Sequence, residues 1–449
     1  MSTLPDPTAA DRLDRLVKGA LKSGADAADA VEFKNISVAV SYRLGKLEDV
    51  GRAESSDLGL RVFIGRQVAF VSSTDFSENA LSALPERAVA MARLAPEDKY
   101  AGLAPRERLA QAIPDVEIDD PQEPSTVLLV ERARAAEGAA LEVPGVTNSE
   151  GGSADYGRTM VTLATSEGFL GGYVGTSRSV AVSVIAGEGT EMERDYDYAQ
   201  TRFASDLESA EAVGKRAAMR AVKRLNPRKV KTQSVPVIFD PRVASSLLGH
   251  FAGAISGAAI ARGVSFLKDR MGEQVFGENI TIIDDPHRKR GTRSKPFDGE
   301  GVANRMTVLI DKGRLTTWLL DSASARQLGL QTTGHAARGT GGPPSPSTTN
   351  LHMAAGALSP VELMADIREG FYVTDLIGMG VNGVTGDYSR GAAGFWIENG
   401  EIAYPVSEVT IAGNLKDMYR NLTPADDLVF RYGTDSPTLR VEGLTIAGE

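Results

Sequence analysis

Histidines are the residues with which this chain could most readily bind a metal or move a proton, and it has four of them and no cysteine. His250 lies in residues 245–263, a run whose apolar spacing predicts a helix. Val243, Leu247 and Ala254 recur with His250 at helical intervals, which places the ring on or beside an apolar stripe. Because buried polar groups are normally hydrogen-bonded, we expect His250 to be a hydrogen-bonded packing residue rather than a metal ligand.

The other histidines, His287, His335 and His352, do not complete a metal site in the sequence. A hydrolytic zinc site needs about three protein ligands, a position for water and a base. No two of the histidines have the i, i+4 spacing that places two imidazoles on one helix face. The absence of cysteine excludes thiolate ligands and disulfides, and the G-x-S-x-G pattern of serine hydrolases is missing too. The sequence predicts no metal site, while a meeting of histidine and serine in space stays open.

A polar loop is the second place where chemistry could be located. Its side chains crowd into nine residues beside a predicted hairpin and comprise Asn382, Thr385, Asp387, Ser389 and Arg390. One interpretation is a turn network, in which short polar side chains bind backbone amides. The other is the wall of a cleft that binds an unstructured peptide or completes the active site of a partner. The residues alone leave both interpretations open.

Two further patterns have simpler explanations. Residues 378–383 fit G-x-G-x-x-G, but a dinucleotide site needs a helix directly afterwards and the next residues carry no helical pattern. The glycines are therefore expected to permit turns. Acidic clusters at residues 191–197 and 284–285 lack the alternating ligand spacing of a calcium loop, so they are expected to be solvated surface.

Composition sets the class of protein. The chain has 449 residues, a net charge of −10 and 42% hydrophobic residues, which is typical of a globular protein with two or three domains. The acidic balance makes nucleic acid an unlikely partner. No stretch is long and apolar enough to cross a membrane, and the first residues lack the pattern of a secretory leader. We expect a cytoplasmic location without membrane attachment.

The N-terminal half reads as helix, meander, connector, meander and helix. Apolar spacing predicts a helix that ends near Gly24 and a second over residues 77–94. The second helix is expected to carry Leu81, Leu84, Ala88 and Met91 on one apolar side. Tight reversals are expected at residues 44–45 and 65–66. A polar connector covers residues 101–124. After the second meander, Ser205 and Glu208 are spaced as the capping box of a helix that Asn226 and the following proline would stop.

The C-terminal half reads as mostly β. Hairpins are predicted around residues 311–313 and at Asn399-Gly400, and a helix is predicted to start at Ser359 and stop at Gly370. The loop at residues 337–350 could be a flexible linker or an ordered, substrate-gated segment. The predicted fold class is α+β, an N-terminal α/β-meander region followed by a β-rich C-terminal domain. Its parts are an α+β segment (1–100), a middle β-meander plus helix (125–225) and the β-rich domain (235–449).

Residues 380–414, which join the Gly-rich polar loop to the Asn399-Gly400 hairpin, resemble the C-terminal region of the PmbA/TldD family. The resemblance extends from about Val31 onward and is again specific over residues 440–448. In this family, paired subunits form a cytosolic bacterial zinc peptidase whose metal ligands belong to the TldD subunit. The resemblance implies a PmbA/TldD-like fold, with an α+β N-terminal region and a β-rich C-terminal domain.

The family's metal pattern is incomplete in this chain. A TldD subunit carries His-Glu-x-x-x-His on one helix and a cysteine near the C-terminus. His250 stands where the first of these histidines would be, whereas Phe251 takes the acid/base position and Ile255 that of the second histidine. The turn that resembles the cysteine-bearing one, from Gly433 on, has none. The resemblance therefore implies a subunit without catalytic residues or metal of its own.

The resemblance implies that the two subunits have different roles. The partner would be a TldD-like subunit that holds zinc and hydrolyses unfolded or short polypeptides, while this chain would shape the cleft and stabilise the partner; a homodimer in isolation is left open. Two other functions remain as alternatives. One is a self-sufficient metallopeptidase with ligands gathered from distant residues, and the other is a non-enzymatic protein that modulates DNA gyrase.

Overall fold

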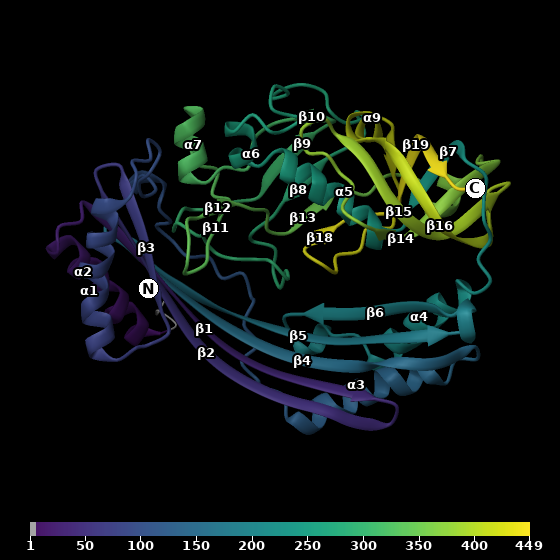
Figure 1. Ribbon diagram of the computed structural model, residues 1–449, viewed down its shortest axis with the longest axis horizontal. Coiled ribbons are helices and arrows are strands. Elements are labelled where there is room, and N and C mark those ends of the chain that lie inside the picture. The colour runs from purple at the N-terminus through teal and green to yellow at the C-terminus, as the bar shows by residue number, and fades with distance from the viewer. Residues whose placement is uncertain (1–5) are drawn as a thin grey trace.

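The computed structural model describes residues 6–449, and its lower layer is one long curved sheet beneath the C-terminal domain (Figure 1). All neighbouring strands of this sheet are antiparallel, and their order is β3-β2-β1-β4-β5-β6. The strands are β1 (Ala27–Arg43), β2 (Lys46–Ile64), β3 (Gln67–Ser73), β4 (Val146–Thr165), β5 (Leu170–Ala186) and β6 (Glu193–Thr201). Because β1 pairs with β4, segments on both sides of the connector share one sheet.

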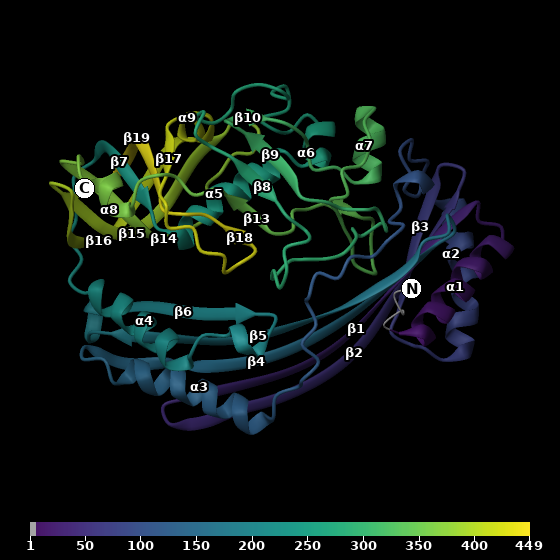
Figure 2. The same cartoon turned by 180° about the vertical axis from the view of Figure 1, so that it is seen from behind.

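Four helices cover one face of this sheet, and Figure 2 shows them in two pairs at opposite ends. They are α1 (Pro7–Lys22), α2 (Glu78–Leu94), α3 (Thr126–Leu141) and α4 (Ala210–Lys223). Side chains two residues apart on β1 point to the same face of the sheet. Ala28 and Ala30 therefore pack under α1 and α2, and Val38 and Val40 pack on the same face under α3. The long strands therefore carry two small helical layers on the same face.

The opposite face of β1 joins the sheet to the C-terminal domain. Val31 packs with Phe297 and Val302 of that domain. Beside it, Asp29 binds Arg61 of β2 and forms an ion pair with Arg338, whose Nη1 lies 2.8 Å from Oδ1. The segment at residues 337–350 is thus anchored on the sheet by a buried ion pair, and the flexible-linker interpretation of this loop does not hold.

The C-terminal domain contains a closed barrel. Its strands are β7 (Gln233–Phe239), β14 (Glu369–Ile377), β15 (Asp387–Glu398), β16 (Glu401–Asn414) and β19 (Leu439–Ala447), with β17 (Leu422–Pro424) attached to β19. The order β16-β15-β14-β7-β19 closes because β19 also pairs with β16. Closure removes the free edges of these strands. The predicted α+β class with a β-rich C-terminal domain is confirmed, whereas the closure of the barrel was not predicted.

A second, smaller sheet and five short helices complete this domain. The sheet is built from β8 (Ile282–Asp284), β9 (Thr307–Asp311), β10 (Arg314–Leu315), β13 (Leu351–Met353) and β18 (Thr434–Asp435), and beside it β11 (Ala336–Ala337) pairs with β12 (Ser345–Pro346). The helices are α5 (Pro241–Ala254), α6 (Gly257–Ala261), α7 (Ser322–Leu328), α8 (Pro360–Met364) and α9 (Leu415–Arg420). The largest hydrophobic core surrounds α5 and joins both sheets. Within residues 6–449, no helix has the length and apolarity to cross a membrane.

The local turn predictions are confirmed. Asn399 and Gly400 have φ values of 51° and 83°, as a type I′ hairpin turn requires, and they join β15 to β16. Lys312 and Gly313 likewise join β9 to β10. The first predicted helix is α1, which ends at Lys22.

Several boundary and burial predictions are wrong. Ser209, not Ser205, caps α4, because the Ser209 hydroxyl accepts from the backbone N–H of Ala212 at 3.2 Å while Glu208 pairs with an arginine. Helix α8 ends at Met364, and Gly370 lies in β14 because backbone bonds from the 399–400 turn hold residues 367 and 368. Met91 of α2 is 47% exposed.

The prediction that the acidic clusters are solvated surface is wrong for part of each cluster, although Glu191 is exposed. Asp195 and Asp197 of β6 are buried, and Asp197 binds Arg216 and Arg220 of α4 at 2.7 and 2.9 Å. Asp284 of β8 is fully buried as well. The prediction failed because the compensating groups come from other elements, which a charge run in the sequence does not reveal.

Candidate functional site

Helix α5 presents His250 beside its buried face. Asp240 caps the helix by accepting from the backbone N–H of Arg242, and Leu247 and Phe251 pack into the core. The half-buried ring of His250 lies edge-on to Tyr388, with 6.2 Å between ring centroids. Among the described residues, its buried Nε2 atom has no hydrogen-bond partner. The expected hydrogen bond is therefore missing at this nitrogen.

The polar loop forms a compact, exposed turn network. The Asn382 side chain accepts from the backbone N–H groups of Val384 and Thr385, at 2.9 and 3.3 Å. Thr385 donates its hydroxyl to Asp387 at 2.6 Å, and Asn414 donates to the other carboxylate oxygen of Asp387 at 3.0 Å. These bonds lower the pKa of Asp387. Three of the five predicted site residues, Asn382, Thr385 and Asp387, thus lie together on the outside of the loop.

Strand alternation separates the remaining predicted residues. Ser389 is exposed like Asp387, two positions before it, whereas Tyr388 and Arg390 share the other face of β15. Arg390 donates through Nη2 to the carbonyl of Leu376 at 3.2 Å, but its buried Nε atom has no partner within residues 6–449. Arg390 is therefore apart from the turn network and beside His250.

Tyr388 is the member of this inner group that the sequence reasoning missed. Its side chain is 1% exposed and its hydroxyl is also unpartnered in the described structure. Burial raises the pKa of Tyr388 to about 12, although Arg390 acts in the opposite direction. Burial, and then the charge of Arg390, lowers the pKa of His250, so the imidazole is neutral near pH 7. Counting the two-residue period of the strand from Arg390 would have identified Tyr388.

The residues present do not fit a zinc site. In the part of the chain that the structure describes, no three histidine, cysteine, aspartate or glutamate side chains stand close enough to hold a metal ion. The next residue after His250, Phe251, faces the core and stacks edge-on with Phe276 at 5.3 Å. Ile255, one turn further on, is fully buried. Thus α5 offers a single potential ligand.

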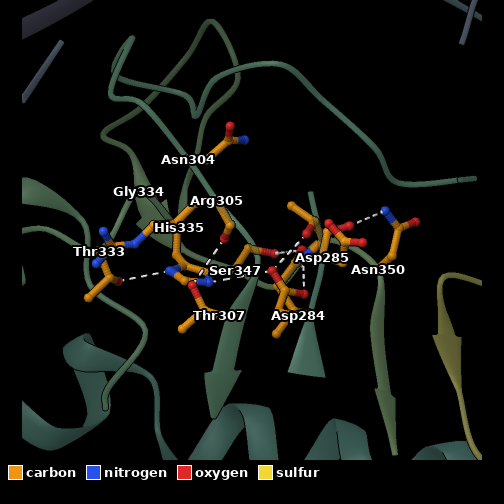
Figure 3. A network of polar contacts seen from close by, with 12 residues as sticks. Asp284, Asp285, Asn304, Arg305, Thr307, Thr333, Gly334, His335, Ser347 and Asn350 are labelled. Carbon is orange, nitrogen blue, oxygen red and sulfur yellow. Dashed lines mark hydrogen bonds and ion pairs between the residues drawn. The ribbon is translucent and has the colours of Figure 1, made fainter. Parts of the chain in front are cut away.

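A hydroxyl, an imidazole and a carboxylate do meet elsewhere, as Figure 3 shows. His335 lies between Thr333, 2.8 Å from Nδ1, and Asp284, 3.4 Å from Nε2. This order is reversed relative to a serine-protease triad, in which the carboxylate binds Nδ1. The Thr333 hydroxyl also accepts from the backbone N–H of Leu320 at 2.8 Å, and His335 is 2% exposed. The group therefore holds the fold and offers no nucleophile to a substrate.

An open cleft of about 650 Å³ lies between the middle segment and the barrel. Its lining includes the basic side chains of Arg220 and Arg242 and the largely apolar side chains of Phe395, Ile402 and Tyr404. Arg220 and Arg242 are themselves paired with buried aspartates. The cleft therefore combines neutralised charge with apolar surface, a lining that suits a polypeptide.

Comparison with known proteins assigns the chain to a family. Models of the PmbA/TldA metallopeptidase match domain 1 at residues 28–92, the central domain at 119–225 and the C-terminal domain at 232–448. An Escherichia coli O157:H7 protein named Metalloprotease PmbA is 42% identical over 432 residues, which cover 96% of this chain and 94% of that protein. The chain belongs to the PmbA/TldD family.

Solved structures of PmbA/TldD relatives have the same architecture over the whole length. A Bacteroides thetaiotaomicron protein described as a modulator of DNA gyrase superposes with a TM-score of 0.91, at 25% identity over 99% of this chain and 100% of that chain. TldE from Thermococcus kodakarensis gives a TM-score of 0.87 at 21% identity, over 97% of this chain and 100% of that one, which shows likeness of fold.

Proposed function

We propose that this chain is the PmbA/TldE-like subunit of a cytoplasmic two-subunit zinc peptidase, in which a TldD-like partner holds the metal. The observation that carries the proposal is the single potential ligand on α5, His250, followed by core residues at the positions of the family's glutamate and second histidine. About three ligands and a base are needed for hydrolysis. The likeness in fold to a protein named TldE supports the same assignment.

In this proposal the chain binds and positions polypeptide rather than cutting it. The cleft beside Phe395 and Tyr404 offers apolar surface for side chains of an unfolded or short polypeptide. The polar loop with Asn382, Thr385, Asp387 and Ser389 is exposed at the surface, so it is available to a substrate or to the partner. The partner's zinc would supply the activated water; every role of this chain is binding and support.

The test mixes the chain with a TldD-like subunit from the same organism. We expect a stable complex by size-exclusion chromatography, peptidase activity only in the mixture, and no more zinc in the isolated chain than in its His250→Ala variant. Full activity of the partner alone, unchanged by this chain, would contradict the proposal.

The runner-up is a self-sufficient metallopeptidase, which is favoured by the name of the E. coli relative at 42% identity. It requires stoichiometric zinc in the isolated chain, lost in His250→Ala, together with peptide cleavage. Direct action on gyrase is a third function, suggested by the description of the Bacteroides protein. A gyrase-binding assay without any TldD-like subunit distinguishes it from the other two.

A further inference from the structure

Three unpartnered polar atoms converge between α5 and β15. They are Nε2 of His250, the hydroxyl of Tyr388 and Nε of Arg390, all buried and without a hydrogen bond among residues 6–449. The rings of His250 and Tyr388 are in edge contact, and Arg390 is near enough to influence the pKa of both. Buried polar atoms without partners are rare in folded proteins, so three in one place indicate a group that the chain itself does not supply.

The chemistry of these atoms defines what that group must be. Guanidinium Nε and the phenol each present a hydrogen, and a neutral imidazole can present one on Nε2. The occupant must therefore be an acceptor with more than one oxygen. Arg390 brings the only full charge, because the imidazole and the phenol are neutral near pH 7, so one negative charge suffices for balance. A carboxylate meets these conditions, and planar pairing with arginine is its favoured geometry.

The surroundings indicate which kind of molecule carries the carboxylate. Tyr388 is 1% exposed and its hydroxyl is buried, so an occupant must be as small as a terminal carboxylate group and neighbouring side chains must move to admit it. Arg390 binds the backbone of β14 at Leu376, directly before Ile377, whose side chain is 63% exposed. One exposed apolar side chain therefore lies close to the charged site, where a side chain of a short peptide can pack.

We propose that His250, Tyr388 and Arg390 form a binding site for a carboxylate of a peptide, supplied by its C-terminus or by an acidic side chain. This inference deepens the proposed function, because it assigns part of polypeptide recognition to this subunit. In the bound state, Arg390 and Tyr388 donate to the carboxylate oxygens, and His250 donates through Nε2. No covalent step is involved.

The test uses the full chain alone and fluorescent alanine tripeptides in an anisotropy titration. We expect the free acid to bind at least about tenfold more tightly than its C-terminal amide, equivalent to ~1.4 kcal/mol. Two further amides, one with an internal glutamate and one with glutamine, distinguish the sources: preference for the glutamate peptide assigns the site to side chains. Equal binding of all four peptides would overturn the proposal.

Variants tie the preference to these residues. Arg390→Gln and Tyr388→Phe should each bring the ratio of acid to amide affinity close to one. Because Tyr388→Phe removes only the hydroxyl oxygen, it tests the site even if the arginine variant misfolds. The exposed Arg368→Gln, in the same domain, is the matched control and should keep the ratio. A ratio unchanged in Tyr388→Phe and Arg390→Gln would contradict the assignment.

A second readout distinguishes binding at His250 from a general loss of affinity. The chain has four histidines, so its imidazole NMR signals can be assigned with single variants. The acid should shift the His250 signal, and the amide should not. Activity in the mixed complex together with equal binding of acid and amide would contradict the inference and leave the proposed function standing. A preference for the acid without activity in the mixed complex would contradict the proposed function and leave the carboxylate site standing.

Discussion

His335 and His250 are both histidines of the C-terminal domain in contact with its core, yet they differ in how their nitrogens are satisfied. His335 has Thr333 on one nitrogen and Asp284 on the other, and Asp284 in turn accepts two hydrogen bonds from Thr349, each of 2.7 Å. His250 has an unpartnered Nε2 beside two further unpartnered atoms. The first arrangement contributes to stability, whereas the second lowers stability but leaves polar atoms free to bind a ligand.

The largest expected effect breaks the satisfied network. Asp284→Ala leaves the backbone N–H and hydroxyl of Thr349 and Nε2 of His335 without their acceptor. Since each buried unsatisfied group costs about 1–3 kcal/mol, the free energy of unfolding should fall by at least about 3 kcal/mol. Urea denaturation measures the loss. The neighbouring Asp285→Ala, which removes one bond to the backbone of His287, is the control and should cost about 1 kcal/mol.

An intermediate effect concerns the two faces of β15 in the mixed complex. The double variant Asp387→Ala with Arg390→Ala should lower proteolysis far more than it lowers the stability of this chain. The single variants sharpen this expectation: Arg390→Ala should account for a loss of about tenfold in rate, equivalent to ~1.4 kcal/mol. Asp387→Ala removes hydrogen bonds at an exposed position, so it should lower the melting temperature of this chain only slightly and leave activity per folded complex intact.

Peptidase rate, complex size and thermal unfolding are measured side by side for these variants. A large fall in melting temperature with normal specific activity in the double variant would assign all these residues to the turn network. Loss of activity in Asp387→Ala alone would instead place the outer face of the loop against substrate or partner.

The smallest expected effect is a change in pH dependence. The pKa of His250 is lowered by burial and by Arg390, so on acidification the unfolded chain takes up this proton first, below about pH 6.5. Stability contributed by the neutral ring is thus present above that pH and lost as pH falls. His250→Leu should reduce the dependence of the free energy of unfolding on pH by at most about 1.4 kcal/mol per pH unit, which corresponds to one proton.

The residual slope has more than one source, because burial lowers the pKa of His352, while burial raises the pKa of Glu300 to about 7 and acts on the slope in the opposite direction. Free energies of unfolding at about pH 7.5 and about pH 5.5 give both slopes. An identical slope in the wild type and in His250→Leu would show that His250 titrates as in the unfolded chain. We also expect the leucine variant to be no less stable at the higher pH, since it removes an unpartnered atom.

Much of the local structure could be predicted from the sequence. The Asn399-Gly400 turn is specified by two adjacent residues that tolerate positive φ, and the stripe containing Leu13 and Leu16 specifies the buried face of α1. The prediction named Ser205 as the cap of α4, whereas Ser209 caps it, because several nearby residues could act as the N-cap and the sequence does not show which side chain is free to do so. Local patterns thus determined elements better than their ends.

Long-range pairing could not be predicted in the same way. Closure of the barrel depends on pairs such as Ile411 with Ile446, which no local pattern encodes. Burial of Asp197 depends on two arginines of α4. The group of His250, Tyr388 and Arg390 depends on a contact between Tyr388 and a helix more than a hundred residues earlier in the chain. The predicted site set contained Arg390 but grouped it with the wrong neighbours, because composition was read without the strand period.

The pairing of β1 with β4 has a consequence for the order of events during synthesis. Ala28 and Ser166, whose backbone and side chain are hydrogen-bonded at this junction, are 138 residues apart. At about 5–20 residues per second, translation needs on the order of 10 s to deliver the second partner after the first. During that interval, β1 presents a long unpaired edge with Val31 and Phe33 uncovered. The nascent chain is therefore a candidate client for chaperones before its central sheet exists.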